Sequence, residues 1–169
     1  MWKKVFIVGS WIFFSFSLTT GLFAQDDVQK HPACQYCGMD RAKFAHSRML
    51  VAYEDGSSAG TCGLHCAAIE FALHIDKIPK TTQVGDYYNK MLVEAETAFW
   101  VLGGNKPGVM TQRAKWAFGK KEDAEKFMKE NGGTMISLEQ AFKAAFEDMY
   151  ADTRIIQERR KMRQMQHKK

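Results

Sequence analysis

The residues best suited to chemistry in this sequence are its four cysteines, which lie close together in the first half of the chain. Cys34 and Cys37 are separated by two residues, and Cys62 and Cys66 by three. Two thiolates at the first spacing can bind one ion from a tight turn, which Gly38 permits because glycine has no Cβ to clash. On a helix the second pair would share one face. The spacing therefore predicts a pocket in which four sulfur atoms meet.

Other soft or borderline metal ligands accompany these cysteines. Thiolates and thioethers select Cu(I) over harder ions, so methionine also matters to a copper site. Met49 lies on a predicted strand and Met110 beside a glycine-rich loop, and each could pack in the core instead of binding a metal. His65 could bind the metal, or it could be an ordinary core or surface histidine without that role. The predicted metal ligands are Cys34, Cys37, Met39, Met49, Cys62, His65, Cys66 and Met110.

Cysteines at these spacings also fit other chemistries. Four thiolates could hold a structural zinc ion, and cysteines of an exported protein could instead form disulfides. A thioredoxin-type oxidoreductase would need its Cys-x-x-Cys at the start of a helix after a buried strand, whereas here a polar segment precedes it. A lyase would need an acid beside the thiols to protonate a leaving carbanion, and although Asp40 and Asp55 are nearby in sequence, nothing marks either as placed for this role.

The first 24 residues have the pattern of a secretory signal peptide. Lys3 and Lys4 precede a long apolar run, and Ala24 stands before a polar segment. An uncleaved N-terminal anchor is the alternative, since the apolar run approaches the length that spans a bilayer. Either interpretation places the rest of the chain outside the cytoplasm, periplasmic or exported. Residues 25–33 are polar and predict a flexible lead-in.

Composition predicts one globular domain, over residues 34–150. Hydrophobic residues make up 46% and charged residues 25%, an ordinary globular balance. The formal net charge is +5, but residues 154–169 hold seven lysines and arginines against one glutamate, so a basic helical tail over 151–169 follows an acidic domain. A nucleic-acid-binding protein would instead have a basic face interleaved with aromatic residues. The tail is either a solvated helix end or a contact for anionic lipid or an acidic partner.

Hydrophobic periodicity and turn residues predict an α+β fold. The order of hairpin, helix and strand occurs twice, which indicates two ββαβ units, with a single mixed sheet as the alternative. Thr61 resembles an N-cap, and Ser137 with Gln140 forms a capping box for a long final helix. The predicted strands are 47–53, 57–60, 81–88, 91–93, 98–102, 114–118 and 134–136, and the predicted helices are 62–75, 121–130 and 138–163.

Several short motifs, taken in order, resemble the NosL family. The resemblance covers about residues 33–146, nearly all of the predicted domain. The motifs are Cys-Gln-Tyr-Cys-Gly-Met at 34–39, Ser-Arg-Met at 47–49, Asp-Tyr-Tyr-Asn at 86–89, Val-Glu-Ala at 93–95, Ala-Phe-Trp-Val at 98–101, Pro-Gly-Val-Met at 107–110, Ala-Phe at 117–118, and residues 124–127 followed by Gly132-Gly133.

The resemblance implies a non-enzymatic Cu(I) metallochaperone for nitrous oxide reductase maturation, with a fold like that of the organomercurial lyase MerB. It also implies partners, namely a periplasmic protein and a transporter that donate or receive copper. Carried onto this chain, Cys37, Met39, Met49 and Met110 become candidate copper ligands. The second pair, Cys62 and Cys66, belongs only to some relatives, and the lipid-bearing cysteine of typical members is missing. The extra pair favours tighter binding by more thiolates, so another copper or heavy-metal pathway is the alternative to nitrous oxide reductase maturation.

Overall fold

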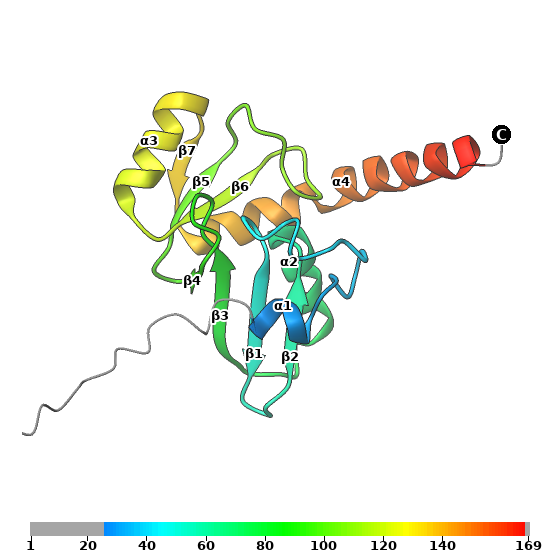
Figure 1. Ribbon diagram of the computed structural model, residues 1–169, viewed down its shortest axis with the longest axis horizontal. Coiled ribbons are helices and arrows are strands. Elements are labelled where there is room, and N and C mark those ends of the chain that lie inside the picture. The colour runs from blue at the N-terminus through cyan, green and yellow to red at the C-terminus, as the bar shows by residue number, and fades with distance from the viewer. Residues whose placement is uncertain (1–25, 168–169) are drawn as a thin grey trace, which may run out of the picture.

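The computed structural model describes residues 26–167, so the predicted signal peptide lies outside the described range. This part of the chain forms two small antiparallel sheets, each with a helix packed on it, and a long last helix, α4 (Leu138–His167), that contacts both units (Figure 1). None of its helices combines the length and the apolar character that crossing a membrane requires.

The two units share one ββαβ topology, and the first has an additional strand. The first contains β1 (Met49–Tyr53), β2 (Ser58–Thr61), α2 (Leu64–Leu73), β3 (Pro79–Gly85) and β4 (Leu92–Glu94), with strand order β2-β1-β3-β4. The second contains β5 (Phe99–Leu102), β6 (Lys115–Phe118), α3 (Lys121–Asn131) and β7 (Thr134–Ile136), with strand order β6-β5-β7. In each sheet the first strand of the unit lies between the second and the third. The predicted α+β fold of two ββαβ units is confirmed, and the single mixed sheet is wrong.

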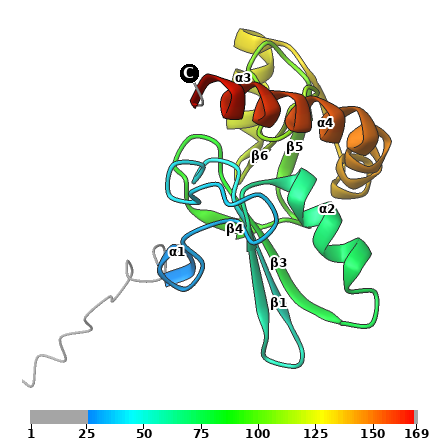
Figure 2. The same cartoon turned by 90° about the vertical axis from the view of Figure 1, so that its right-hand side faces the viewer.

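The second sheet is buried on both faces, which explains how the units are joined. Neighbouring residues of a strand point to opposite faces. Trp100 accordingly packs in a core shared with α2 and α4, whereas Val101 packs in a second core with Phe127 of α3. Figure 2 shows α2 along one side of the first sheet, with the second unit above it. The shared core fixes α2, and the cysteine on it, relative to α4.

Helix α4 begins where the sequence predicts and continues without a break through the predicted boundary at residue 150. Its capping box is confirmed, because the Ser137 N–H donates to Gln140 Oε1 (2.9 Å) and the Gln140 N–H to Ser137 Oγ (3.2 Å). Beyond the predicted boundary, Asp152 is buried, and the helix then projects past the rest of the molecule (Figure 1). The tail is therefore the outer half of one helix.

The prediction of a flexible lead-in over 25–33 is wrong for its described residues, 26–33. Residues Asp26–Lys30 form the short helix α1, and the Asp27 side chain is buried. Its carboxylate accepts hydrogen bonds from Arg41 (2.8 Å) and Arg48 (2.9 Å), two arginines that are themselves buried. Arg41 also donates to the Thr61 carbonyl at the end of the hairpin (3.1 Å). The polar composition of this segment concealed a buried ion cluster.

The helix predicted over 62–75 is shorter than expected. Thr61 does not cap it, because Thr61 is the last residue of β2 and pairs with Met49 of β1. Gly63 stands at the N-cap position, and α2 begins at Leu64. Thr61 therefore belongs to the β-ladder and not to the helix, although its residue type is typical of an N-cap. Cys62 therefore lies in the corner between strand and helix.

Candidate metal centre

The first cysteine pair is carried by a closed turn over residues 34–39. The Cys34 N–H donates to the Met39 carbonyl (2.8 Å), and the Gly38 N–H donates to the Cys34 carbonyl (2.8 Å). Gly38 has φ 73°, in the left-handed region that glycine adopts without strain. The turn brings the thiols of Cys34 and Cys37 to one side, and it does not lie at the start of a helix.

The second pair comes from the corner after β2. Cys62 precedes α2, and Cys66 lies on its first turn. The Ser47 hydroxyl donates to the Cys62 carbonyl (2.8 Å), which fixes the backbone of the corner. The two cysteines thus reach the same site although only one of them is helical.

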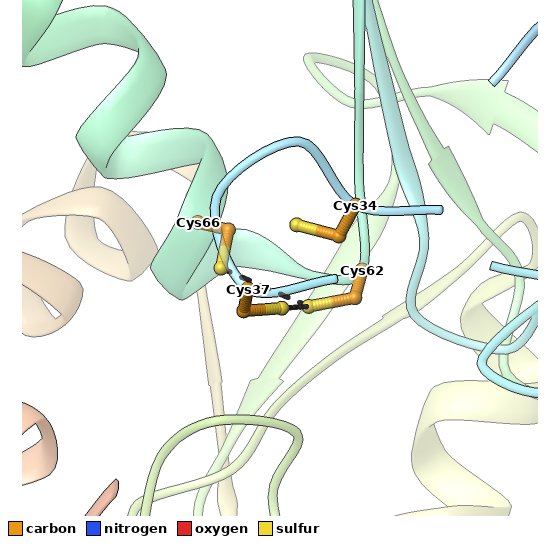
Figure 3. Close-up of side chains that lie close together, drawn as sticks. All are labelled: Cys34, Cys37, Cys62 and Cys66. Atoms are coloured by element: carbon orange, nitrogen blue, oxygen red, sulfur yellow. Dashed lines mark hydrogen bonds between the residues drawn. The ribbon is translucent and has the colours of Figure 1, made fainter. Parts of the chain in front are cut away.

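The four sulfur atoms meet in one cluster (Figure 3), and they all lie within 4.8 Å of one another. The Sγ atoms of Cys37 and Cys62 are 3.4 Å apart, and those of Cys62 and Cys66 are 3.8 Å apart. A tetrahedral ion with metal–sulfur bonds of about 2.3 Å separates its sulfur ligands by about 3.8 Å. All four cysteines are free thiols. The cluster therefore has the dimensions of a four-sulfur metal site.

The thiols differ in exposure and in acidity. Cys34, Cys62 and Cys66 are at most 1% exposed, whereas Cys37 is half-buried. Hydrogen bonds from the thiol of Cys37, and then of Cys62 and Cys66, lower the pKa of Cys34. Hydrogen bonding to Cys34, together with burial, raises the pKa of Cys62 and of Cys66. The hydrogen bond to Cys34 raises the pKa of Cys37, but the bonds to Cys62 and Cys66 outweigh it and lower that pKa as well. The cluster thus favours thiolates at the first cysteine pair, and metal bonds to Cys62 and Cys66 must release protons.

A buried carboxylate anchors the first turn to α2. Glu70 is 2% exposed and lies one helical turn after Cys66. It accepts hydrogen bonds from Gln35 and from Tyr36 (2.5 Å), the two residues between the first cysteines, and from Tyr53 of β1 (2.7 Å). Burial and the bond to Glu70 raise the pKa of Tyr36 to about 12, so this hydroxyl stays a donor. Glu70 therefore sets the position of one cysteine pair relative to the other.

Two of the predicted methionine ligands border the cluster. Met39 and Met110 pack against the cysteines from outside. Met110 has φ 59°, an uncommon backbone conformation for any residue but glycine, and the surrounding loop has to maintain it. Both thioethers lie beside the sulfur cluster and on the wall of a groove.

The other two auxiliary ligands are directed elsewhere. Met49 is fully buried in the shared core with Leu64 and Val84, so packing accounts for it. His65 is buried and lies outside the four-thiol cluster, with its Nδ1 3.8 Å from the Asp152 carboxylate on α4. Burial lowers the pKa of His65, and the negative charge of Asp152 opposes that shift. Alternation along β1 could have indicated Met49 as a core residue.

A groove of about 650 Å³ opens beside Cys37. Its walls are the first cysteine turn, the loop over 107–112 and the outer half of α4. Three arginines on that helix line it, and one of them, Arg160, donates a hydrogen bond to the Cys37 carbonyl (3.0 Å). The residues lining the groove from α4 are Asp152, Ile155, Ile156, Arg159, Arg160 and Arg163.

The sequence alone did not reveal this groove or the role of Glu70. The sequence offered one signal for Glu70: it follows Cys66 by four residues, which places an acid on the helix face that carries the cysteine. For Arg160 no such signal exists, because 123 residues separate it from the carbonyl that it contacts. Asp40 and Asp55, the acids considered for a lyase, lie in local turns. Asp40 accepts a hydrogen bond from the Ala42 N–H (2.9 Å), and Asp55 accepts one from the Ser57 N–H (2.8 Å).

A fold of two ββαβ units that carries a cluster of four thiols defines a small domain with a candidate metal site, and comparison with known proteins identifies its family. The family model of NosL matches residues 25–146, so the chain belongs to the NosL family. Among solved structures, the crystal structure of the copper chaperone NosL from Shewanella denitrificans matches with 22% identity and a TM-score of 0.48. The match covers 62% of this chain and 85% of that one. No curated protein matches the chain.

Proposed function

We propose that this protein is a Cu(I) carrier, a metallochaperone rather than an enzyme. The observation that carries the proposal is a cluster of four free thiols, three buried and one half-buried at a groove. Thiolates prefer soft ions such as Cu(I), with Zn²⁺ as the main competitor, over harder ions. A carrier must hold its ion firmly and still pass it on, and a cluster reached through one accessible sulfur suits that task. Membership of the NosL family supports the same conclusion.

The signal-peptide pattern of the sequence and the membership of the family support a proposal for the setting of this activity. We propose that the protein is exported, periplasmic in a bacterium with two membranes, where it receives copper from one protein or transporter and delivers it to another. Maturation of nitrous oxide reductase is one pathway of this kind, and a related copper pathway is the other. The projecting basic half of α4 would let the protein approach a membrane surface.

Structural zinc is the competing function, and one observation favours it. The sulfur separations of 3.4 and 3.8 Å suit tetrahedral Zn²⁺ as well as copper. Against it, Cys37 is half-buried and lines a groove, which gives an ion in the cluster a route for exchange that a structural ion does not need. The fold also has two apolar cores away from the cysteines, which reduces its need for a metal.

A competition titration tests the proposal. The reduced protein is titrated with Cu(I) without oxygen, against a chelator of known affinity, while circular dichroism follows the fold. We expect a folded metal-free protein that takes up one Cu(I) and slowly returns it to excess chelator. A protein that takes up no copper, or that unfolds when zinc is removed, would establish the cluster as a scaffold.

Glu70→Gln is expected to weaken copper binding, although Glu70 supplies no ligand atom to the cluster. A neutral amide has one acceptor oxygen in place of two, so it cannot hold Gln35, Tyr36 and Tyr53 together. Loss of a supporting residue of this kind lowers metal affinity about 10–100-fold. The same titration measures the change. Glu94→Gln is the control, because Glu94 is exposed and bonds Gln83 far from the cluster; equal affinities in the two variants would refute the anchoring role.

A further inference from the structure

The groove beside Cys37 has the features of a ligand-binding site. Its volume of about 650 Å³ lies within the range of roughly 300–1,000 Å³ that small-molecule sites occupy. Phe44, Val109, Ile155 and Ile156 give it an apolar lining, and a few charged groups converge at its rim. Such a combination of apolar walls with few polar groups is what binds and orients a small ligand.

The charge of the groove is positive. Arg159, Arg160 and Arg163 line it from α4, and the acid among its lining residues is Asp152. Asp152 is buried, with one carboxylate oxygen accepting from the Gln112 N–H (3.0 Å) and the other facing His65 at 3.8 Å. The guanidinium groups are therefore the charges that a ligand in the groove would meet, and they match carboxylates.

The groove also presents sulfur. Cys37, Met39 and Met110 line it, and of the four clustered thiols Cys37 is the one that reaches its wall. An ion that enters the cluster through this groove meets Cys37 and the two thioethers before the three buried thiols. Positive charge and sulfur ligands thus occur on the same short path.

The wall that carries the arginines is fixed in place. Asp148 of α4 binds Arg113 (2.9 Å) and the buried Lys115 (2.5 Å), and the Gln112–Asp152 bond ties the loop over 107–112 to the same helix. The arginines accordingly follow an anchored part of α4, and Arg160 itself contacts the cysteine turn through the Cys37 carbonyl. The groove is a built feature and not the gap beside a loose tail.

We propose that this groove binds an anionic, low-molecular-weight thiol complex of Cu(I), which loads the cluster by ligand exchange. This inference rests on the proposed carrier function. The carboxylates of the complex pair with the groove arginines, and its sulfur atoms bring Cu(I) to Cys37. Each Cu–S bond formed with the protein replaces one Cu–S bond of the complex. The departing thiolate takes up the proton that the protein thiol releases, so no electron changes hands.

The test compares copper donors that differ in charge. Loading rates are measured from Cu(I) complexes of mercaptosuccinate, which has two carboxylates, and of uncharged mercaptoethanol, at equal free Cu(I). The groove variant is Arg159→Ala with Arg163→Ala, which leaves the Arg160 contact to Cys37 in place. The matched control is Arg154→Ala with Lys161→Ala, which removes two charges from the same helix away from the groove.

We expect the groove variant to load about tenfold more slowly than the wild type from mercaptosuccinate at low ionic strength, and equally fast from mercaptoethanol. Added salt should remove most of the difference. The control variant should load at the wild-type rate from both donors. Equal slowing of both variants, or of neither, would overturn the proposal. If the wild type takes up no Cu(I) from either donor, the carrier function itself fails; if it loads normally and the groove variant is unaffected, only this inference fails.

Discussion

Cys62→Ser is expected to lower the affinity for Cu(I) more than any other single substitution. Cys62 is fully buried, and its sulfur lies 3.4 Å from that of Cys37 and 3.8 Å from that of Cys66, so it is the central ligand of the cluster. A serine hydroxyl is a hard ligand that Cu(I) disfavours. The loss should exceed the roughly 10–100-fold that removal of a supporting residue costs. Competition with a Cu(I) chelator measures it.

The fold of this variant should survive, because the two apolar cores do not include Cys62. Met128→Leu is the control: it removes a sulfur atom that packs against the second core, and the affinity for Cu(I) should stay unchanged. Wild-type affinity in Cys62→Ser would mean that copper binds elsewhere. Unfolding of Cys62→Ser would instead support structural zinc.

Asp27→Asn is expected to give the largest loss of stability. The carboxylate of Asp27 is the buried partner of both Arg41 and Arg48. The substitution removes the negative charge that the two buried arginines share, and removal of one partner of a buried ion pair costs about 3–5 kcal/mol. Urea denaturation measures the free energy of unfolding. Asp76→Asn, at an exposed position, should change it by no more than about 0.5 kcal/mol; a similar small change in Asp27→Asn would show that the ion cluster contributes little.

The same cluster predicts a dependence of stability on pH. Burial opposes the ionisation of Asp27, but hydrogen bonds and charge from Arg48 and Arg41 outweigh it and lower the pKa below the ordinary value of 3.8. The folded state thus binds this proton less readily than the unfolded state. The contribution of Asp27 is fully present above pH 3.8 and is lost as the pH falls through the lowered pKa. Asp27→Asn should lack this part of the acid transition.

Local patterns predicted most of the fold because each was decided by near neighbours. Ser137 and Gln140 cap α4 through bonds within four residues, and the strand Thr134–Ile136 follows a two-glycine stop. Thr61 was assigned to a helix because its capping propensity was visible and its pairing with Met49 was not. Asp27 was assigned to a flexible segment for the same reason, since both of its arginine partners lie further along the chain.

The candidate site was predictable in its cysteines and less so in its surroundings. Two short spacings sufficed to expect that Cys34, Cys37, Cys62 and Cys66 meet. Met49 and His65 were named because they are near in sequence, yet strand alternation directs Met49 into the core and α2 directs His65 toward Asp152. The arginines of the groove come from the far end of the chain, and only the packing of α4 brings them to the cysteines.

Copper K-edge X-ray absorption of the Cu(I)-loaded protein tests the central claim most directly, because it identifies the atoms bound to the ion. We predict a first shell of sulfur alone, supplied by the four-cysteine cluster. The shell should lose sulfur in Cys62→Ser and keep it in Met128→Leu. A shell that contains imidazole nitrogen, or one that Cys62→Ser leaves unchanged, would contradict the account and place the copper outside the thiol cluster.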